Sequence, residues 1–340
     1  MLDRFQRPLR DLRVSVTDRC NLRCPYCMPR EVFGAAFQFL PREQLLSFEE
    51  IAQVVRAAAA HGVTKVRLTG GEPLLRRDLE RLVEMLAEVE GIADLALTSN
   101  GLLLARHARR LRDAGLRRVT VSLDSLEAHT LRAMSDAPVS PAHILEGIDA
   151  ASEAGLSPVK INMVVRRGVN DHCVAEMAAR FRHRPEIVRF IEYMDVGSTN
   201  GWRAEEVVSA SEILDAVRAR WPLEPLPPAR PGEVATRYRY RDGAGEIGVI
   251  HSVSSPFCGG CSRARLSADG QLFTCLFARK GHDLRGLLRS GAAAGELERR
   301  LHEIWSARED RYSAERLAAR GEVHQQQQQQ PKIEMSYIGG

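Results

Sequence analysis

Short β-rich runs alternate with amphipathic helical stretches through roughly the first 200 residues, and this alternation limits the possible folds more than any other feature. Strands separated by helices at such spacing predict βα units whose strands pair in parallel in an α/β fold. Counting six units favours an incomplete, TIM-like (βα)6 barrel over a doubly wound sheet. The predicted strands are 12–17, 65–70, 95–100, 119–124, 159–165 and 188–194, and the predicted helices are 48–62, 79–91, 105–115 and 142–155.

Polar residues and glycines gather where the predicted strands end. Barrel enzymes place their chemistry at the C-terminal ends of the strands. Strand ends are also turns, and turns are polar for structural reasons alone, but agreement among five strands favours a site. The residues concerned are Arg67, Thr69–Glu72, Thr98–Asn100, Ser122, Asp124, Lys160, Asn162, Glu192 and Met194.

The character of the sequence changes after about residue 200. Five prolines in 221–234 predict a connector or an extended arm. The elements expected after it are strands at 236–242 and 246–253, a hairpin at 263–277 turning at Asp269-Gly270, and helices near 283–305 and 313–320. The expected domains are a partial barrel over 1–220, a smaller α+β domain covering its open side over 221–324, and a flexible tail over 325–340 that begins with glutamines.

The composition argues against several classes of protein. A formal charge of only +4 gives no indication of a nucleic-acid partner. No apolar run approaches the roughly 20 residues of a membrane-spanning helix, and arginine and aspartate interrupt the N-terminal segment, unlike a secretory signal. We therefore expect a cytoplasmic protein that binds neither membranes nor nucleic acid. In that reducing compartment, clustered cysteines indicate metal or redox ligands before disulfides.

The seven cysteines include two groups of three. A zinc tetrahedron needs four ligands. A four-iron cluster accepts three protein thiolates, because its fourth iron can bind a small molecule. Two [4Fe-4S] clusters are therefore expected, with a zinc ion shared between the groups or unrelated buried thiols as alternatives, and Cys173 is expected to be an ordinary cysteine. The first triplet is Cys20, Cys24 and Cys27, and the second is Cys258, Cys261 and Cys275.

The motifs carry a resemblance to a known family. The first triplet, with Tyr26 before its last cysteine, is similar to the signature of radical S-adenosylmethionine (SAM) enzymes, and LTGGEPLL at 68–75 resembles their glycine-rich turn. The segment 257–277 and the terminal Gly-Gly further resemble the GTP 3′,8-cyclases of molybdenum cofactor biosynthesis, over essentially the whole chain from Arg13. Ser262, where that family usually has asparagine, and the glutamine run depart from the pattern without touching a ligand.

The resemblance implies a radical SAM lyase. Reductive cleavage of SAM would give a 5′-deoxyadenosyl radical, which takes the hydrogen from C3′ of GTP, and C3′ then bonds to C8 to form 3′,8-cyclo-7,8-dihydro-GTP. Implied partners are a low-potential electron donor and a downstream cyclic pyranopterin monophosphate synthase, and the protein would be a monomer or a homodimer. The alternatives are another two-cluster radical SAM enzyme, such as a peptide maturase, and a non-catalytic iron–sulfur electron carrier.

The resemblance also implies roles for individual residues. Guanine would bind the open iron of the second cluster. The terminal Gly-Gly would enter the active site, where residues without side chains suit a crowded pocket. The implied SAM contacts are Tyr26, Gly71, Ser122 and Met194. The implied GTP contacts are Arg13, Arg67, Thr98, Lys160, Arg263 and Arg265, and the implied catalytic residues are Arg13, Arg263, Arg265, Gly339 and Gly340.

Overall fold

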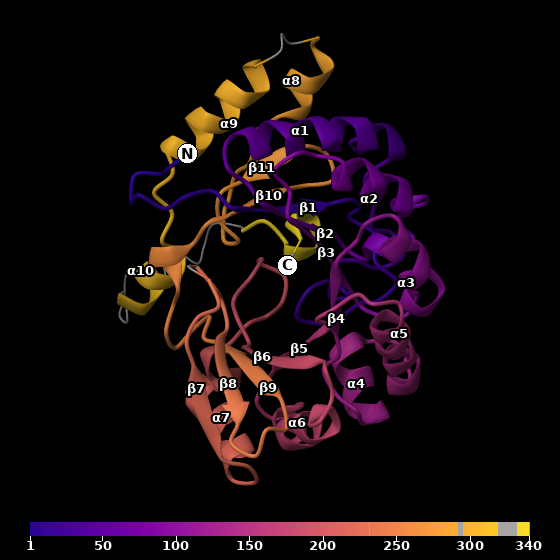
Figure 1. Ribbon diagram of the computed structural model, residues 1–340, viewed down its shortest axis with the longest axis vertical. Helices are drawn as coiled ribbons and strands as arrows, with labels where there is room; N and C mark the ends of the chain where they lie inside the picture. Colours follow the sequence, from indigo (N-terminus) through magenta and orange to yellow (C-terminus); the bar gives the residue numbers. More distant parts are fainter. Residues whose placement is uncertain (231, 292–294, 319–331, 340) are drawn as a thin grey trace.

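The fold is built on one open sheet of 12 strands (Figure 1). It is seen in a computed structural model that describes residues 1–230, 232–291, 295–318 and 332–339. The first six strands pair in parallel and in chain order, as the alternation predicts. They are β1 (Asp11–Ser15), β2 (Lys65–Thr69), β3 (Asp94–Ser99), β4 (Arg118–Ser122), β5 (Lys160–Val165) and β6 (Ile187–Glu192).

Two later strands extend this parallel set at both ends. β10 (Arg263–Leu266) pairs in parallel with β1, and β9 (Glu246–Ile250) pairs in parallel with β6. The sequence did not predict either pairing. Antiparallel strands complete the two edges: β11 (Gln271–Phe273) and β12 (His282–Asp283) beside β10, and β8 (Thr236–Tyr240) and β7 (Leu223–Leu226) beside β9. The sheet does not close, which confirms the predicted incomplete α/β barrel.

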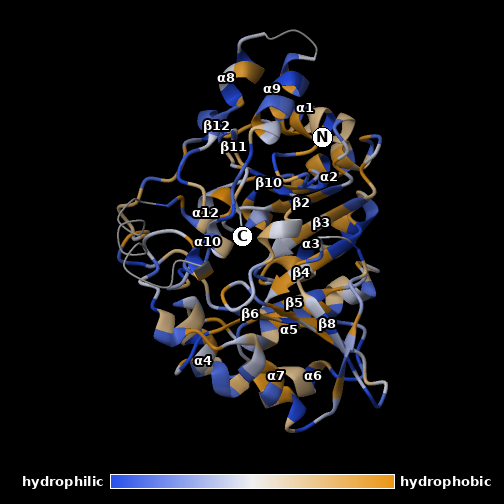
Figure 2. Ribbon diagram, turned by 90° about the vertical axis from the view of Figure 1, so that its left-hand side faces the viewer, coloured by the Kyte–Doolittle hydropathy of each residue, from blue (hydrophilic) through white to orange (hydrophobic). Residues whose placement is uncertain are grey.

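Helices cover the outside of the curved sheet, and apolar residues concentrate in the strands and the inward helix faces (Figures 1 and 2). Ser47 and Glu50 form a capping box at the start of α1, which is why that helix begins at Phe48. No helix among the described residues is long and apolar enough to cross a membrane. The helices are α1 (Phe48–Ala60), α2 (Leu79–Ala87), α3 (Leu104–Asp113), α4 (Ala128–Ser135), α5 (Pro141–Glu153), α6 (Val174–Phe181), α7 (Ala210–Arg218), α8 (Arg285–Arg289), α9 (Glu296–Ser306), α10 (Tyr312–Ala318) and α12 (Met335–Ile338).

The C-terminal part differs from the prediction in two places. The single helix expected near 283–305 is wrong: α8 and α9 are separate, and Gly291 and Gly295 between them have positive φ angles of 73° and 85°, which a continuous helix excludes. Part of the proline-rich connector forms β7, whose Pro225 is tolerated because β7 lies at the edge of the sheet.

Other predictions for this part are confirmed or remain predictions. The 263–277 hairpin is confirmed, with Gly270 at φ 86° in its turn. The boundary at residue 220 remains a prediction, and the sheet continues across it. The glutamine run at 325–330 and Gly340 lie outside the described residues.

A candidate active site between two cysteine triplets

A cavity of ≈ 540 Å³ lies inside the curve of the sheet. Its walls include residues of β1 to β6, β9 and β10. Gly339 lies against Thr69, and Gly340 is outside the described part of the chain. The other predicted site residues all line the cavity: Arg13, Cys20, Cys24, Tyr26, Cys27, Arg67, Gly71, Thr98, Ser122, Lys160, Met194, Cys258, Cys261, Arg263, Arg265 and Cys275.

The sulfur spacing tests whether the triplets fit clusters or single ions. All six thiols are free and partly exposed toward the cavity. Tetrahedral zinc, with Zn–S bonds of about 2.3 Å, would draw its sulfurs to within roughly 4 Å of one another. In neither triplet do the three Sγ atoms lie within 4.8 Å of one another, although every cysteine belongs to the described residues. At least one sulfur pair in each triplet is therefore wider than a single zinc ion requires, whereas a four-iron cluster takes three thiolates on three different irons.

The loop carrying the first triplet packs directly on the glycine-rich turn after β2. Gly71 N donates to Thr17 O (2.8 Å) and Glu72 N donates to Arg19 O (2.8 Å). A Cβ on Gly71 would lie 2.2 Å from Arg19 O, so only glycine fits at this position. The glycine is therefore required by the backbone that leads into Cys20, a reason that the sequence did not reveal.

Glu72 ties the same turn to the end of β3. Its carboxylate accepts hydrogen bonds from Ser99 Oγ (2.9 Å), Leu74 N (3.0 Å) and Asn100 N (2.7 Å). Asn100 in turn donates to Asn21 in the cysteine loop (2.7 Å). Burial raises the pKa of Glu72 to about 7 against these hydrogen bonds. This side chain is a structural link between three segments of the site.

Tyr26 is held by a buried carboxylate. Its hydroxyl donates to Asp124 Oδ2 (2.8 Å), while Val164 N donates to Asp124 Oδ1 (2.9 Å). Burial raises the pKa of Asp124 to about 6, and these hydrogen bonds oppose the shift. Tyr26 is thereby fixed at the cavity wall between Cys24 and Cys27 in the chain.

Five basic residues and Asp11 form two rows across three adjacent strands. Arg265, Arg13 and Arg67 are register partners on β10, β1 and β2. Two residues earlier in each strand, Arg263, Asp11 and Lys65 are register partners. Residues two apart in a strand point to the same face, so both rows face the cavity. Like charges opposite each other destabilise a sheet, which indicates a site built for an anion.

Most of the basic side chains in these rows have no carboxylate partner in an ion pair within the described chain. Lys65 and Asp11 form a buried ion pair. Arg67 donates only to the hydroxyls of Thr98 (3.3 Å) and Thr120 (3.5 Å). The cavity-lining cations that form no ion pair with a carboxylate of the described chain are Arg10, Arg13, Arg67, Lys160, Arg189, Arg263 and Arg265.

Burial first, and repulsion between neighbouring cations second, lower the pKa values of these side chains. Burial, followed by the charges of Arg265, Arg67 and Arg263, holds the pKa of Arg13 well below its ordinary value. Burial and neighbouring arginines likewise lower the pKa of Arg189 to about 9. Burial and Arg189 lower that of Lys160 to about 7. A polyanion in the cavity would relieve this repulsion.

Cations also lie against the second triplet. Arg263 donates to Cys261 Sγ (3.3 Å). Burial opposes ionisation of Cys261, but the charges of Arg263 and Arg308 outweigh it and lower the pKa of this thiol to about 6. A low pKa favours the thiolate form, which is the form that binds a metal.

The C-terminal segment returns to the cavity, whose lining includes Met335 of α12. Arg265 Nε donates to Gly339 O (3.3 Å). A Cβ on Gly339 would lie 2.1 Å from Thr69 Cγ2, and its φ of 74° disfavours other residues. The absence of a side chain at Gly339 is thus a requirement of its packing.

Asp11, Lys65 and Arg189 are among the cavity residues that were missing from the predicted site. The first two could have been found, because the chain places a charged residue two positions before an arginine at 11–13, 65–67 and 263–265. Arg189 carries no such signal. Cys173 is buried at the start of α6, outside both triplets, with its Sγ 3.3 Å from Ser125 Oγ and grouped with Glu127 and His172.

Comparison with known proteins agrees with this geometry. The model of the Radical SAM superfamily matches residues 14–181, and that of Molybdenum Cofactor Synthesis C matches residues 187–314. A "GTP 3′,8-cyclase" of Acidothermus cellulolyticus is 56% identical over 356 residues, covering 99% of this chain and 98% of the relative. Proteins of the same name from Xanthomonas campestris pv. campestris (strain B100) and Staphylococcus haemolyticus are 51% and 45% identical, covering 100% and 99% of this chain and 97% and 98% of the relatives.

Solved structures share the fold. Streptococcus suis SuiB bound to precursor peptide SuiA superposes with a TM-score of 0.60 at 15% identity, covering 92% of this chain and 67% of that chain. The same protein bound to S-adenosylmethionine gives a TM-score of 0.59 at 15% identity, over 87% of this chain and 68% of that chain. At this identity, the likeness concerns the fold alone.

Proposed function

Since the chain belongs to the GTP 3′,8-cyclase family within the radical SAM superfamily, we propose that it cyclises GTP to 3′,8-cyclo-7,8-dihydro-GTP in molybdenum cofactor biosynthesis. The observation that supports this proposal most strongly is the group of five basic side chains in the two rows that line the same cavity as the cysteine triplets. A triphosphate needs several cations, and arginine is suited to bind its oxygens in a fork. An electron carrier would need no such surface.

The first triplet would hold one [4Fe-4S] cluster. When bound, that cluster would supply the electron that cleaves SAM, and the resulting 5′-deoxyadenosyl radical would remove the C3′ hydrogen of GTP. Near it, Ser122 offers a hydroxyl, Gly71 a main chain without a side chain, and Met194 an apolar contact for SAM. Tyr26, fixed by Asp124, would close the cavity wall on the same side.

The opposite part of the cavity would take GTP. The basic rows would hold the triphosphate, with Lys160 and the Thr98 hydroxyl as further contacts. Cys258, Cys261 and Cys275 would hold a second [4Fe-4S] cluster, and guanine would bind beside it. Arg265 would fix the tail through Gly339 O, so that Gly339 and Gly340 exclude water beside the reacting carbons. The implied partners are a low-potential electron donor and the synthase that consumes the product.

Anaerobic incubation of the reconstituted protein with GTP, SAM and dithionite tests the proposal. GTP deuterated at C3′ should transfer its label to 5′-deoxyadenosine, and the cyclised nucleotide should appear in equal amount. Release of 5′-deoxyadenosine without any dependence on GTP would indicate a maturase, and no release would indicate an electron carrier. Cys24→Ser should abolish both products, whereas Cys173→Ser, outside both triplets, should retain them.

A further inference from the structure

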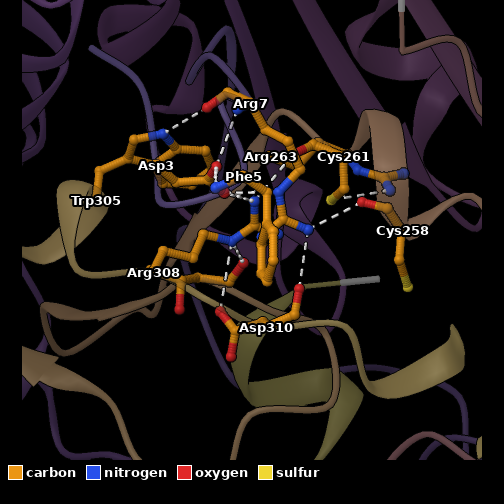
Figure 3. A network of polar contacts seen from close by, with 10 residues as sticks. Asp3, Phe5, Arg7, Cys258, Cys261, Arg263, Trp305, Arg308 and Asp310 are labelled. Atoms are coloured by element: carbon orange, nitrogen blue, oxygen red, sulfur yellow. Dashed lines mark hydrogen bonds and ion pairs between the residues drawn. The ribbon is translucent and has the colours of Figure 1, made fainter. Parts of the chain in front are cut away.

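A buried carboxylate and two buried arginines lie next to the second triplet (Figure 3). Asp3 and Arg7 belong to the N-terminal segment, and Arg308 follows α9. Their side chains are at most 2% exposed. Asp3 Oδ2 accepts from Arg7 Nε (2.6 Å) and from Arg308 NH1 (3.0 Å), so one carboxylate joins both guanidinium groups.

The two arginines reach the main chain of each segment that carries a cysteine of this triplet. Arg7 NH1 donates to Cys258 O (2.9 Å). Arg308 NH1 donates to Cys261 O (2.9 Å), and its Nε donates to Thr274 O (3.0 Å), the carbonyl directly before Cys275. Three segments that are separated in the chain are therefore held by one ion-paired unit.

The unit is itself fixed by its surroundings. Phe5 N and Arg7 N both donate to Asp3 Oδ1 at 2.9 Å, and Trp305 Nε1 donates to Arg7 O (3.1 Å). The Arg308 guanidinium lies 4.5 Å from the centre of the Trp305 ring. A buried carboxylate with two arginines in fixed rotamers costs desolvation energy that an apolar core would avoid. The ion-paired unit lies behind the three cysteine-bearing segments, and its role in holding them would explain why it is buried despite this cost.

We propose that Asp3, Arg7 and Arg308 are positioning residues that hold the Cys258, Cys261 and Cys275 segments in the spacing needed to retain the second cluster. The proposal rests on the proposed function only in taking these cysteines as cluster ligands. The three residues act through the main-chain carbonyls of the ligand segments. Partners behind metal ligands typically change metal affinity by about 10–100-fold.

Arginine-to-lysine variants keep the positive charge but remove the forked guanidinium group with its several donor nitrogens. Arg308 uses two different nitrogens for its acceptors, whereas lysine has one. In Arg7→Lys and Arg308→Lys, we expect a chelator to strip the second cluster about 10–100-fold faster, with iron content falling toward about half of wild type. The electron paramagnetic resonance signal of the first cluster should persist.

The matched control is Arg4→Gln. Arg4 lies in the same N-terminal segment and pairs with Glu309, next to Arg308, but both side chains are exposed (61% and 67%). This variant should retain both clusters at the wild-type rate. A second readout is the spectrum of the second cluster alone, recorded for Arg7→Lys and Arg308→Lys in a background in which Cys20, Cys24 and Cys27 are replaced by alanine; it should change in line shape.

Two results would overturn the proposal. One is an unchanged stripping rate and an unchanged second-cluster spectrum in both lysine variants. The other is loss of both clusters together, because that would indicate general unfolding and not selective positioning. Failure of the proposed function would look different: wild-type protein with two intact clusters would form no cyclised GTP, while iron content and spectra would still judge the positioning residues.

Discussion

At the residue scale, the site depends on close contacts that only particular side chains allow. Gly71 and Gly339 both touch neighbours that a Cβ would displace, the main chain of Arg19 and the side chain of Thr69. Lys160, by contrast, stands among cations with no hydrogen bond or ion pair of its own in the described chain. The two glycines are needed for packing, and Lys160 contributes a positive charge. Substituting Gly71 or Gly339 should therefore lower the stability of the fold, whereas substituting Lys160 should change the binding of GTP.

Gly71→Ala should destabilise the protein. The new methyl would lie 2.2 Å from Arg19 O, a main-chain atom that cannot rotate away. We expect a loss of about 1–3 kcal/mol in the free energy of unfolding, measured from denaturant midpoints at constant m-value. Gly259→Ala is the stability control, because a Cβ there meets nothing within 4 Å. Equal midpoints for the two variants would contradict the packing explanation.

Lys160 should make GTP binding dependent on pH. Its pKa of about 7 reflects burial and the charges of Arg189, Arg118 and Arg67, opposed only by Glu233. Free Lys160 is therefore largely neutral above pH 7. A bound triphosphate would raise the pKa of Lys160, so GTP binding would add a proton to this side chain. GTP affinity should fall as pH rises from about 7 to about 9, by at most about tenfold per pH unit.

Calorimetric titrations of the reconstituted protein with GTP in two buffers would measure that proton uptake directly. The γ-phosphate has finished most of its own titration in this range, since its pKa is about 6. Lys160→Arg keeps a positive charge throughout, so its affinity should be nearly flat with pH. The same slope in wild type and Lys160→Arg would assign the pH dependence to another group.

At the element scale, local patterns in the sequence predict the positions of strands and helices. They do not predict which strands that are distant in the chain pair with one another. The alternation of strands and helices is a short-range pattern, and it located β1 to β6 within a few residues. The pairing of β10 with β1 joins segments about 250 residues apart, where Arg10 N and Asp11 N both donate to Ser262 O. No local pattern encodes that contact. The two cysteine triplets were recognised for the same reason, because the cysteines of each triplet lie close together in the sequence.

Arg189 shows the same limit within the site. It sits in a strand that was correctly predicted, but membership of the cavity follows from which face of the curved sheet a residue occupies. Period-two geometry gives a face only relative to other residues of the same strand. Arg189 enters the cavity wall because β6 lies between β5 and β9, a neighbour that the sequence did not predict.

Asp195 should anchor the two C-terminal elements. This buried carboxylate follows β6 and accepts hydrogen bonds from Tyr312 Oη (2.6 Å), Lys332 Nζ (2.8 Å) and Arg316 NH1. Asp195→Asn would leave two buried cations without their counter-charge, at a cost of about 3–5 kcal/mol. We expect faster amide hydrogen exchange in α10 and in 332–339, and weaker docking of Gly339.

A surface carboxylate provides the comparison for Asp195. Asp215 is 74% exposed and lies 3.8 Å from Arg218, so Asp215→Asn should leave exchange in both segments unchanged. If exchange in Asp195→Asn matched wild type, the anchoring of the tail would have to come from Glu334, which accepts from Ser198 N (2.9 Å) and Thr199 Oγ1 (3.0 Å).

At the scale of the whole molecule, the site is assembled from parts that meet only in the folded chain. The first triplet lies between β1 and α1 in the chain, and the second lies between β9 and β12, yet both face one cavity. The N-terminal segment, the turn after α9 and the C-terminal segment all contact the second triplet or its arginines. The cavity is positive as a whole, so its occupant should alter the stability of the entire protein.

GTP should therefore stabilise the protein more than guanosine does. At a ligand concentration about 100 times the Kd, binding to the folded state alone adds about 2.7 kcal/mol to the free energy of unfolding. The effect should decline with added salt, because the triphosphate is recognised through charge. Thermal unfolding of the anaerobic, reconstituted protein with GTP, guanosine and inorganic triphosphate would separate the contributions of phosphate and base.

Arg13 gives this prediction its sharpest form, because two effects of opposite sign are expected from one substitution. Arg13 stands between Arg265 and Arg67 in register, and its buried Nε has no hydrogen-bond partner among the described residues. Arg13→Met keeps the length and removes the charge, so the ligand-free protein should gain roughly 1 kcal/mol in stability. The same variant should lose most of its stabilisation by GTP. An arginine that lowers the stability of the ligand-free protein has a physical explanation if it binds the ligand. Arg13→Met that is less stable than wild type without ligand, or equally stabilised by GTP, would show that Arg13 serves the sheet and not the nucleotide.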